Sequence, residues 1–89
     1  MDIRNEFKPG DIVTSVSGRD KKRCYVVMST ADRIVEICDG DLHKINKLKK
    51  KNVKHIKHVG VFSETIGEKL AGGEKISDGE IRKVISAVE

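Results

Sequence analysis

The sequence predicts a mainly β protein, in which a small antiparallel barrel of about five short strands is followed by one or two short helices. Three observations predict this class. Up to about residue 60, short runs rich in Ile and Val alternate with turn residues. No helical periodicity separates those runs, and helical patterning begins only after Ser63. Short strands joined by turns are typical of small all-β barrels.

The first expected strand covers residues 11–16. Ile12, Thr14 and Val16 alternate with Val13 and Ser15, so the two sets fall on opposite faces of a strand. Gly18 supplies the conformational freedom that a tight hairpin needs, and the second strand is expected at 24–28. Tyr25, within that strand, is expected to pack in the core.

Further β-rich runs follow. Residues 33–38 predict a third strand, which ends at the strong turn signal Asp39-Gly40. We expect additional strands over 41–48 and 53–59, the former with imperfect alternation of polar and apolar residues. The barrel domain is therefore assigned to residues 8–60, and residues 61–89 to an acidic helical C-terminal appendage.

The appendage has two helical signals. A helix around 64–70 ends at Ala71-Gly72-Gly73. A second begins at a capping box, with Ser77 at the N-cap and Glu80 at N3, and with Ile76 and Ile81 spaced as a hydrophobic staple. One face of this helix is apolar and either docks on the barrel or binds a partner; it consists of Ile81, Val84, Ile85 and Val88.

Positive charge is concentrated in the middle of the chain. The net charge is +4, yet residues 21–60 have eleven Lys and Arg against four Asp and Glu, whereas residues 61–89 have four against six. Such segregation is typical of nucleic-acid-binding proteins. Two groups of cations stand out as candidate RNA-binding residues: Arg19, Lys21, Lys22 and Arg23 in the first hairpin loop, and Lys44, Lys47, Lys49, Lys50, Lys51 and Lys54 in a lysine strip that continues to Lys57.

These cations also have a structural interpretation. A hairpin tip is usually polar, and lysine keeps the edge of a sheet from pairing with another chain. Seven lysines within residues 44–57 exceed what solubility ordinarily requires, which favours contact with a sugar-phosphate backbone. Arg19, Arg23 and Arg33 are better suited to bidentate or stacking contacts. Because the chain has only three aromatic residues, we expect recognition of structured RNA through shape and phosphates.

Other classes of function find no support in the residue pattern. Cys24 and Cys38 lack a CxxC spacing and are expected to be thiols, and with His43, His55 and His58 they match no zinc motif. No catalytic constellation or phosphate loop is present, so we expect neither an enzyme nor a cofactor nor a metal. Without a long apolar run or an apolar signal segment near Met1, a cytoplasmic location without membrane attachment is expected.

Two stretches resemble a known family. The first stretch runs from Gly10-Asp11-Ile12-Val13 through Gly18-Arg19-Asp20-Lys21 to Val26-Val27. It resembles the KOW motif of ribosomal proteins and NusG-class elongation factors. The second stretch includes Asp39-Gly40-Asp41-Leu42, Lys49-Lys50-Lys51-Asn52 and Lys54-His55-Ile56. It is similar to the corresponding part of bacterial KOW-domain proteins that are related to eukaryotic and archaeal large-subunit ribosomal proteins. The resemblance covers roughly residues 8–60. Lys22 and Tyr25 replace glycines of the general pattern, and Leu48 replaces a proline.

This resemblance implies an SH3-like barrel whose loops and basic edge contact RNA. The expected function is a non-catalytic RNA-binding module that contacts ribosomal or other structured RNA, is monomeric when free and acts at the ribosome in translation. The alternative is an SH3-like protein-interaction module that binds a transcription or translation factor through its sheet edge or its C-terminal helix.

Overall fold

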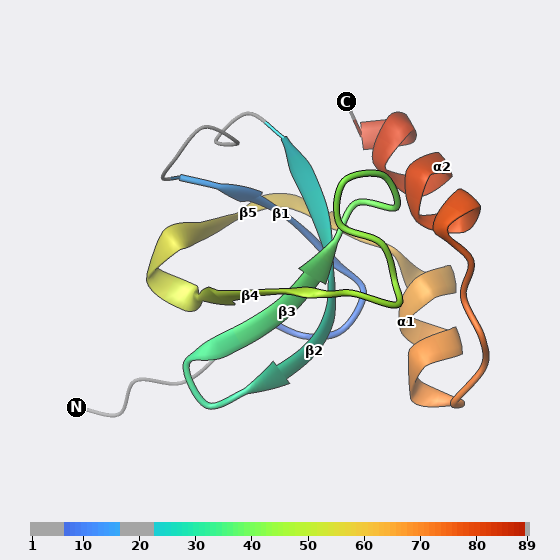
Figure 1. The fold of residues 1–89 in the computed structure, drawn as a ribbon, viewed down its shortest axis with the longest axis horizontal. Coiled ribbons are helices and arrows are strands. Elements are labelled where there is room, and N and C mark those ends of the chain that lie inside the picture. The colour runs from blue at the N-terminus through green and yellow to red at the C-terminus, as the bar shows by residue number, and fades with distance from the viewer. Residues whose placement is uncertain (1–6, 17–22, 89) are drawn as a thin grey trace.

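Five antiparallel strands form a single sheet, and two helices follow it along the chain (Figure 1). The computed structural model describes residues 7–16 and 23–88. The spatial order of the strands in the sheet is β4-β3-β2-β1-β5, so the last strand returns beside the first. The elements are β1 (Asp11–Ser15), β2 (Cys24–Ala31), β3 (Ile34–Cys38), β4 (Lys49–Asn52), the 3₁₀ turn η1 (Val53–His55), β5 (Ile56–Phe62), α1 (Glu64–Ala71) and α2 (Asp78–Val88).

The mainly β class is confirmed, but the sheet is not closed. Within the described residues, β4 and β5 form its two edges and are joined through η1. A bulge interrupts the pairing of β1 with β5, because Asp11 lies opposite Phe62 whereas Val13 lies opposite His58. The additional residues of β5 include Gly60, whose φ of 84° is the left-handed conformation that glycine adopts at low cost.

The sheet buries apolar side chains on both faces, which explains the unbroken apolar run in β2. Cys24 and Val26 face the helices, and Tyr25 and Val27 lie on the opposite face. The helix side also contains Ile12, Cys38, Ile66, Ile76, Ile81 and Ile85, and the other side contains Val13, Val35, Ile37 and Ile56. Tyr25 is 1% exposed, so its predicted core position is confirmed.

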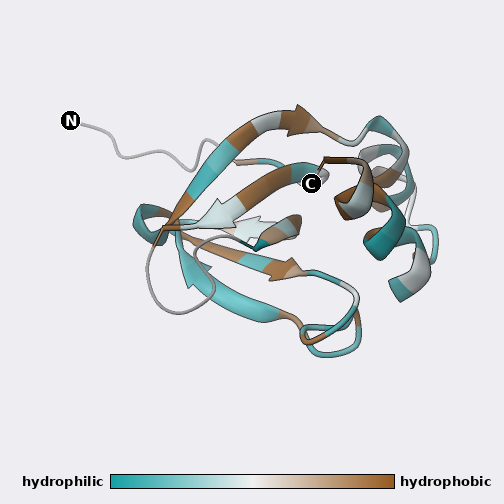
Figure 2. Cartoon of the chain, turned by 90° about the horizontal axis from the view of Figure 1, so that it is seen from above, coloured by the Kyte–Doolittle hydropathy of each residue, from teal (hydrophilic) through white to brown (hydrophobic). Residues whose placement is uncertain are grey.

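Both helices cover the same side of the sheet (Figure 2). The Ser77 side chain accepts a hydrogen bond from the backbone N–H of Glu80 at 3.2 Å, which confirms the predicted N-cap. Ile76 and Ile81 are both buried in the helix-side core, as a hydrophobic staple requires. The apolar face of α2 therefore docks on the sheet of the same chain.

Three predicted strands were wrong in extent. The strand predicted for 24–28 continues as β2 to Ala31, because Ser29, Thr30 and Ala31 pair with β3. Residues 41–48 form turns, because the backbone N–H groups of His43 and Ile45 donate to the side chains of Asp39 and Asp78 instead of pairing with a neighbouring strand. The fourth strand lies instead at 49–52. Residues 53–55 form η1, and the strand predicted for 53–59 occurs as β5 at 56–62. None of the helices in the described residues has the length and apolar character needed to cross a bilayer.

Candidate nucleic-acid interface

The lysines of β4 divide between the two faces of the sheet. Lys49 lies opposite Ile37 and Lys51 opposite Val35, and both partners are fully buried. The half-buried Lys49 and Lys51 are therefore on the core side of this edge strand. Lys50 is exposed and lies opposite Glu36, on the other face. Although β4 is hydrophilic along its whole length (Figure 2), it does not direct all three ammonium groups to one side.

Lys44 and Lys47 lie in the turn segment before β4. Both are exposed, and the backbone N–H of Lys47 donates to the carbonyl oxygen of Lys44 at 2.9 Å. Lys54 is exposed in η1, where the Asn52 side chain accepts from its backbone N–H. Lys57 follows, exposed, in β5. In Figure 1, η1 lies at the end of the sheet far from the helices. The helices contain most of the acidic residues of 61–88.

Few carboxylates neutralise these lysines. Ion pairs involving described residues include Lys69–Glu80 in the helices and those of Arg23, described below. Within the described ranges, no ion pair joins Lys44, Lys47, Lys50 or Lys54 to a carboxylate. Their charges are thus available for an external polyanion.

Arg23 has a different environment from these lysines. Its Nη1 donates to Oδ2 of Asp39 at 3.0 Å and lies 3.8 Å from Oδ2 of Asp41. The hydrogen bond to Asp39 is the main reason that the pKa of Arg23 is raised. The structure therefore places Arg23 in an intramolecular ion pair. The other predicted cations of this loop, Arg19, Lys21 and Lys22, lie outside the described residues.

Asp39 organises the segment that precedes the lysines. Its buried carboxylate accepts the backbone N–H groups of Asp41 at 2.9 Å and His43 at 2.8 Å, besides the Arg23 guanidinium. Burial alone would raise the pKa of Asp39, but the three hydrogen bonds outweigh it and hold the pKa below its ordinary value. Sequence reasoning missed this role, although an Asp followed by Gly and Asp is typical of a side chain that accepts N–H groups within its own turn.

The same segment is fixed to α2, beside which it lies in Figure 1. Asp78 accepts the backbone N–H of Ile45 at 2.8 Å through Oδ1, and Arg82 donates to the carbonyl oxygen of Gly40 at 2.6 Å. Gly40 has a φ of 74°, and the backbone of α2 leaves no space there for a side chain. The turns that present Lys44 and Lys47 are therefore held between the sheet and the C-terminal helix.

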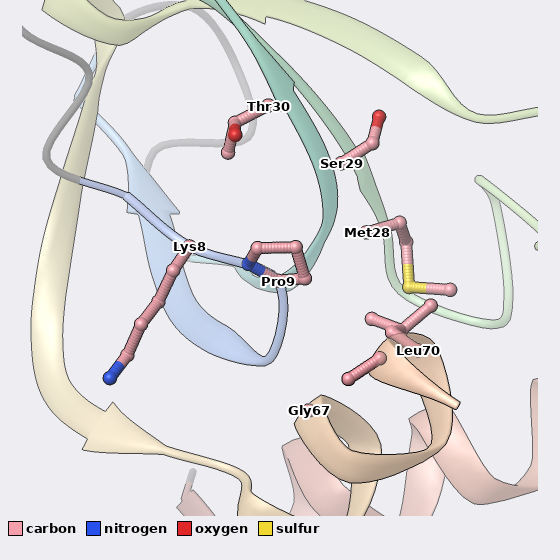
Figure 3. A pocket seen from close by; sticks show the side chains of 8 residues that line it. Lys8, Pro9, Met28, Ser29, Thr30, Gly67 and Leu70 are labelled. Carbon is pink, nitrogen blue, oxygen red and sulfur yellow. The ribbon is translucent and has the colours of Figure 1, made fainter. Parts of the chain in front are cut away.

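The described residues offer little that suggests catalysis. A depression between residues 8–9, β2 and α1 is walled by Pro9, Met28 and Leu70, and the ammonium end of Lys8 points away from it (Figure 3). No group of three metal-ligating side chains occurs in the part of the chain that the structure describes. Cys24 and Cys38 are free thiols, as predicted, and burial is the main factor that raises the pKa of Cys38 to about 12.

Comparison with known proteins found no matching family model and no matching curated protein.

Proposed function

We propose that this chain is a non-catalytic RNA-binding module of the KOW type, with an SH3-like barrel, that contacts ribosomal or other structured RNA mainly through phosphates. The observation that carries the proposal is a set of exposed lysines without ion pairs between residue 44 and η1, namely Lys44, Lys47, Lys50 and Lys54. Lysine ammonium groups offer point charges without a planar fork, so they follow a phosphate backbone without reading base sequence.

The fold is compatible with this proposal. Four strands form a meander, the fifth returns beside the first, and apolar side chains are buried on the face of the sheet opposite the helices. The lysines occur where the chain passes from one edge strand to the other through η1. The residues that resemble the KOW motif include Ile12 and Val13 in β1 and Val26 and Val27 in β2, and these are core residues at the centre of the sheet.

The structure lends less support to the protein-interaction alternative through the C-terminal helix. Ile81 and Ile85 are buried against the sheet, and Val84 and Val88 are partly buried beside them. A partner would have to displace α2 before it could use this face.

The test is a binding titration of the full chain against ribosomal RNA, with duplex DNA as a second ligand, at several salt concentrations. The test variant is Lys47→Glu with Lys54→Glu, since both side chains are exposed without ion pairs. Lys50 is left unchanged because a glutamate there would face Glu36 across the strand pair. The control variant, Lys75→Glu with Lys83→Glu, changes the net charge equally at exposed helix-side positions.

We expect the test variant to bind RNA more weakly than the control. If each lysine neutralises one phosphate, the slope of log affinity against log salt falls by about 0.7–0.9 for each residue removed. Equal losses in the two variants would refute an interface at the lysines. If wild type fails to bind either nucleic acid below about 0.2 M salt, the proposed function is wrong and the protein-interaction alternative is preferred.

The hairpin loop is tested separately with Lys21→Glu and Lys22→Glu. Arg23 must remain in this experiment, because its loss would also remove the hydrogen bond to buried Asp39 and disturb the neighbouring turns. Unchanged RNA affinity in this double variant would exclude these two lysines from the interface.

A further inference from the structure

Aromatic side chains that are distant in the sequence meet along β5. The rings of Phe7 and His58 are stacked, with centroids 4.4 Å apart and planes inclined by 22°. At the end of the same strand, Nζ of Lys8 lies 4.2 Å from the centre of the Phe62 ring. Residues 7–8 and β5 thus combine rings and a cation on one edge of the sheet, which could not be recognised from their sequence positions.

Two glycines fix the position of the Phe62 ring. A Cβ added to Gly10 would lie 2.7 Å from Cε1 of Phe62, and one added to Gly67 would lie 2.6 Å from Cζ. Both distances are far shorter than carbon atoms tolerate, so only glycine at these positions lets the ring lie where it does. The edge of the ring is therefore held by backbone, while the residue as a whole remains 39% exposed.

Among the described residues, the cation over this ring is the ammonium end of Lys8, an exposed residue with a flexible side chain. The Lys8 ammonium over the ring is a cation–π contact, worth roughly 0.5–1 kcal/mol at exposed sites. Stacking of a nucleobase on an aromatic ring is usually worth more than such a contact. A base could therefore displace the ammonium, which is then within reach of the phosphate attached to that base.

We propose that Phe62 and Lys8 bind one unpaired nucleotide of an RNA ligand, with the base stacked on the ring and the phosphate bound by the ammonium. This inference rests on the proposed function. It adds a base-binding site to a surface otherwise suited to phosphates alone. The site lies at the helix end of β5, whereas Lys54 in η1 lies at the other end of the same strand and Lys57 lies between them.

A tryptophan probe tests the stacking directly. The chain has no tryptophan and its single tyrosine is buried, so Phe62→Trp introduces a unique fluorophore at the proposed site. The two ligands are single-stranded oligoadenylate and inorganic polyphosphate of similar charge, which has no bases. We expect oligoadenylate to quench the fluorescence and polyphosphate to bind without quenching it. Quenching by both ligands, or by neither, would overturn the proposal.

Affinity measurements provide a second test that does not depend on tryptophan fitting between the glycines. Phe62→Leu keeps an apolar side chain against Gly10 and Gly67 but removes the ring, so oligoadenylate affinity should fall roughly 5- to 150-fold. Phe62→Tyr keeps the ring and should retain the affinity. If Phe62→Leu binds oligoadenylate as tightly as wild type, while the double variant Lys47→Glu, Lys54→Glu binds weakly, the base site is refuted and the proposed function stands. If wild type binds no RNA, both fail.

Discussion

Replacement of Asp39 by alanine should destabilise the protein strongly, although the residue lies in a turn. The carboxylate has 3% of its side-chain surface exposed and accepts three hydrogen bonds, one of them from the Arg23 guanidinium. Breaking a buried ion pair costs about 3–5 kcal/mol. Water can rehydrate part of Arg23, whose side chain is 38% exposed, and the backbone N–H of exposed Asp41. We therefore expect a loss of about 3 kcal/mol in the free energy of unfolding.

Urea unfolding at pH 7 measures this loss. With an m-value of about 1–1.5 kcal/mol/M for a chain of this size, the midpoint should fall by roughly 2–3 M. Asp41→Ala is the matched control, because that carboxylate is mostly exposed and 3.8 Å from Arg23, and it should change the free energy by less than about 0.5 kcal/mol. Equal effects of the two substitutions would refute the assignment of Asp39 as the centre of this segment.

The pH dependence supplies an independent check. Because the pKa of Asp39 is lower in the folded protein than in the unfolded chain, its stabilisation is complete above about pH 4–5. As pH falls through the folded pKa, the carboxylate becomes protonated and the stabilisation is lost. The difference in stability between wild type and Asp39→Asn should therefore be constant near neutral pH and narrow below pH 4. A difference that widens on acidification would contradict this reasoning.

Three further predictions concern the helices and the core. Gly67→Ala should destabilise the protein by about 1–3 kcal/mol in thermal unfolding, because the new methyl group overlaps the Phe62 ring. This loss is expected although alanine has a better helix propensity than glycine. Combining Gly67→Ala with Phe62→Leu should recover much of the lost stability. Ser77→Ala should cost about 1 kcal/mol in urea unfolding by removing the N-cap of α2, and an unchanged midpoint would contradict the cap. The buried thiol of Cys38, with its pKa near 12, should resist Ellman's reagent at pH 8 in the folded protein and react once urea is added.

The elements that sequence reasoning located correctly are those specified by nearby residues. The N-cap of α2 depends on Ser77 and Glu80, three positions apart, and its buried face follows a helical period from Ile81. Most of the strand Cys24–Ala31 was also predicted, because an apolar run of this length is compatible with a strand covered on both faces.

The strand β4 was missed because its residues have no local preference for a strand. A run of three lysines and an asparagine has low β-propensity, and the strand forms by pairing with β3, whose Val35 and Ile37 are buried on the core side. Likewise, the turns of 41–48 depend on Asp78, whose carboxylate accepts a hydrogen bond from the backbone N–H of Ile45. The two residues are 33 positions apart in the sequence. Such contacts are set by tertiary packing and leave no periodic signal in the sequence.

The positions of the lysines help to separate edge protection from RNA contact. Lysines that only prevent edge pairing are needed on the edge strand itself, and Lys49, Lys50 and Lys51 satisfy that need in β4. Lys44 and Lys47 precede the strand and Lys54 follows it, in turns where no strand edge needs protection. Edge protection therefore does not explain these three exposed charges. Binding to a polyanion that extends beyond β4 accounts for them, which supports the proposed contact with an RNA backbone.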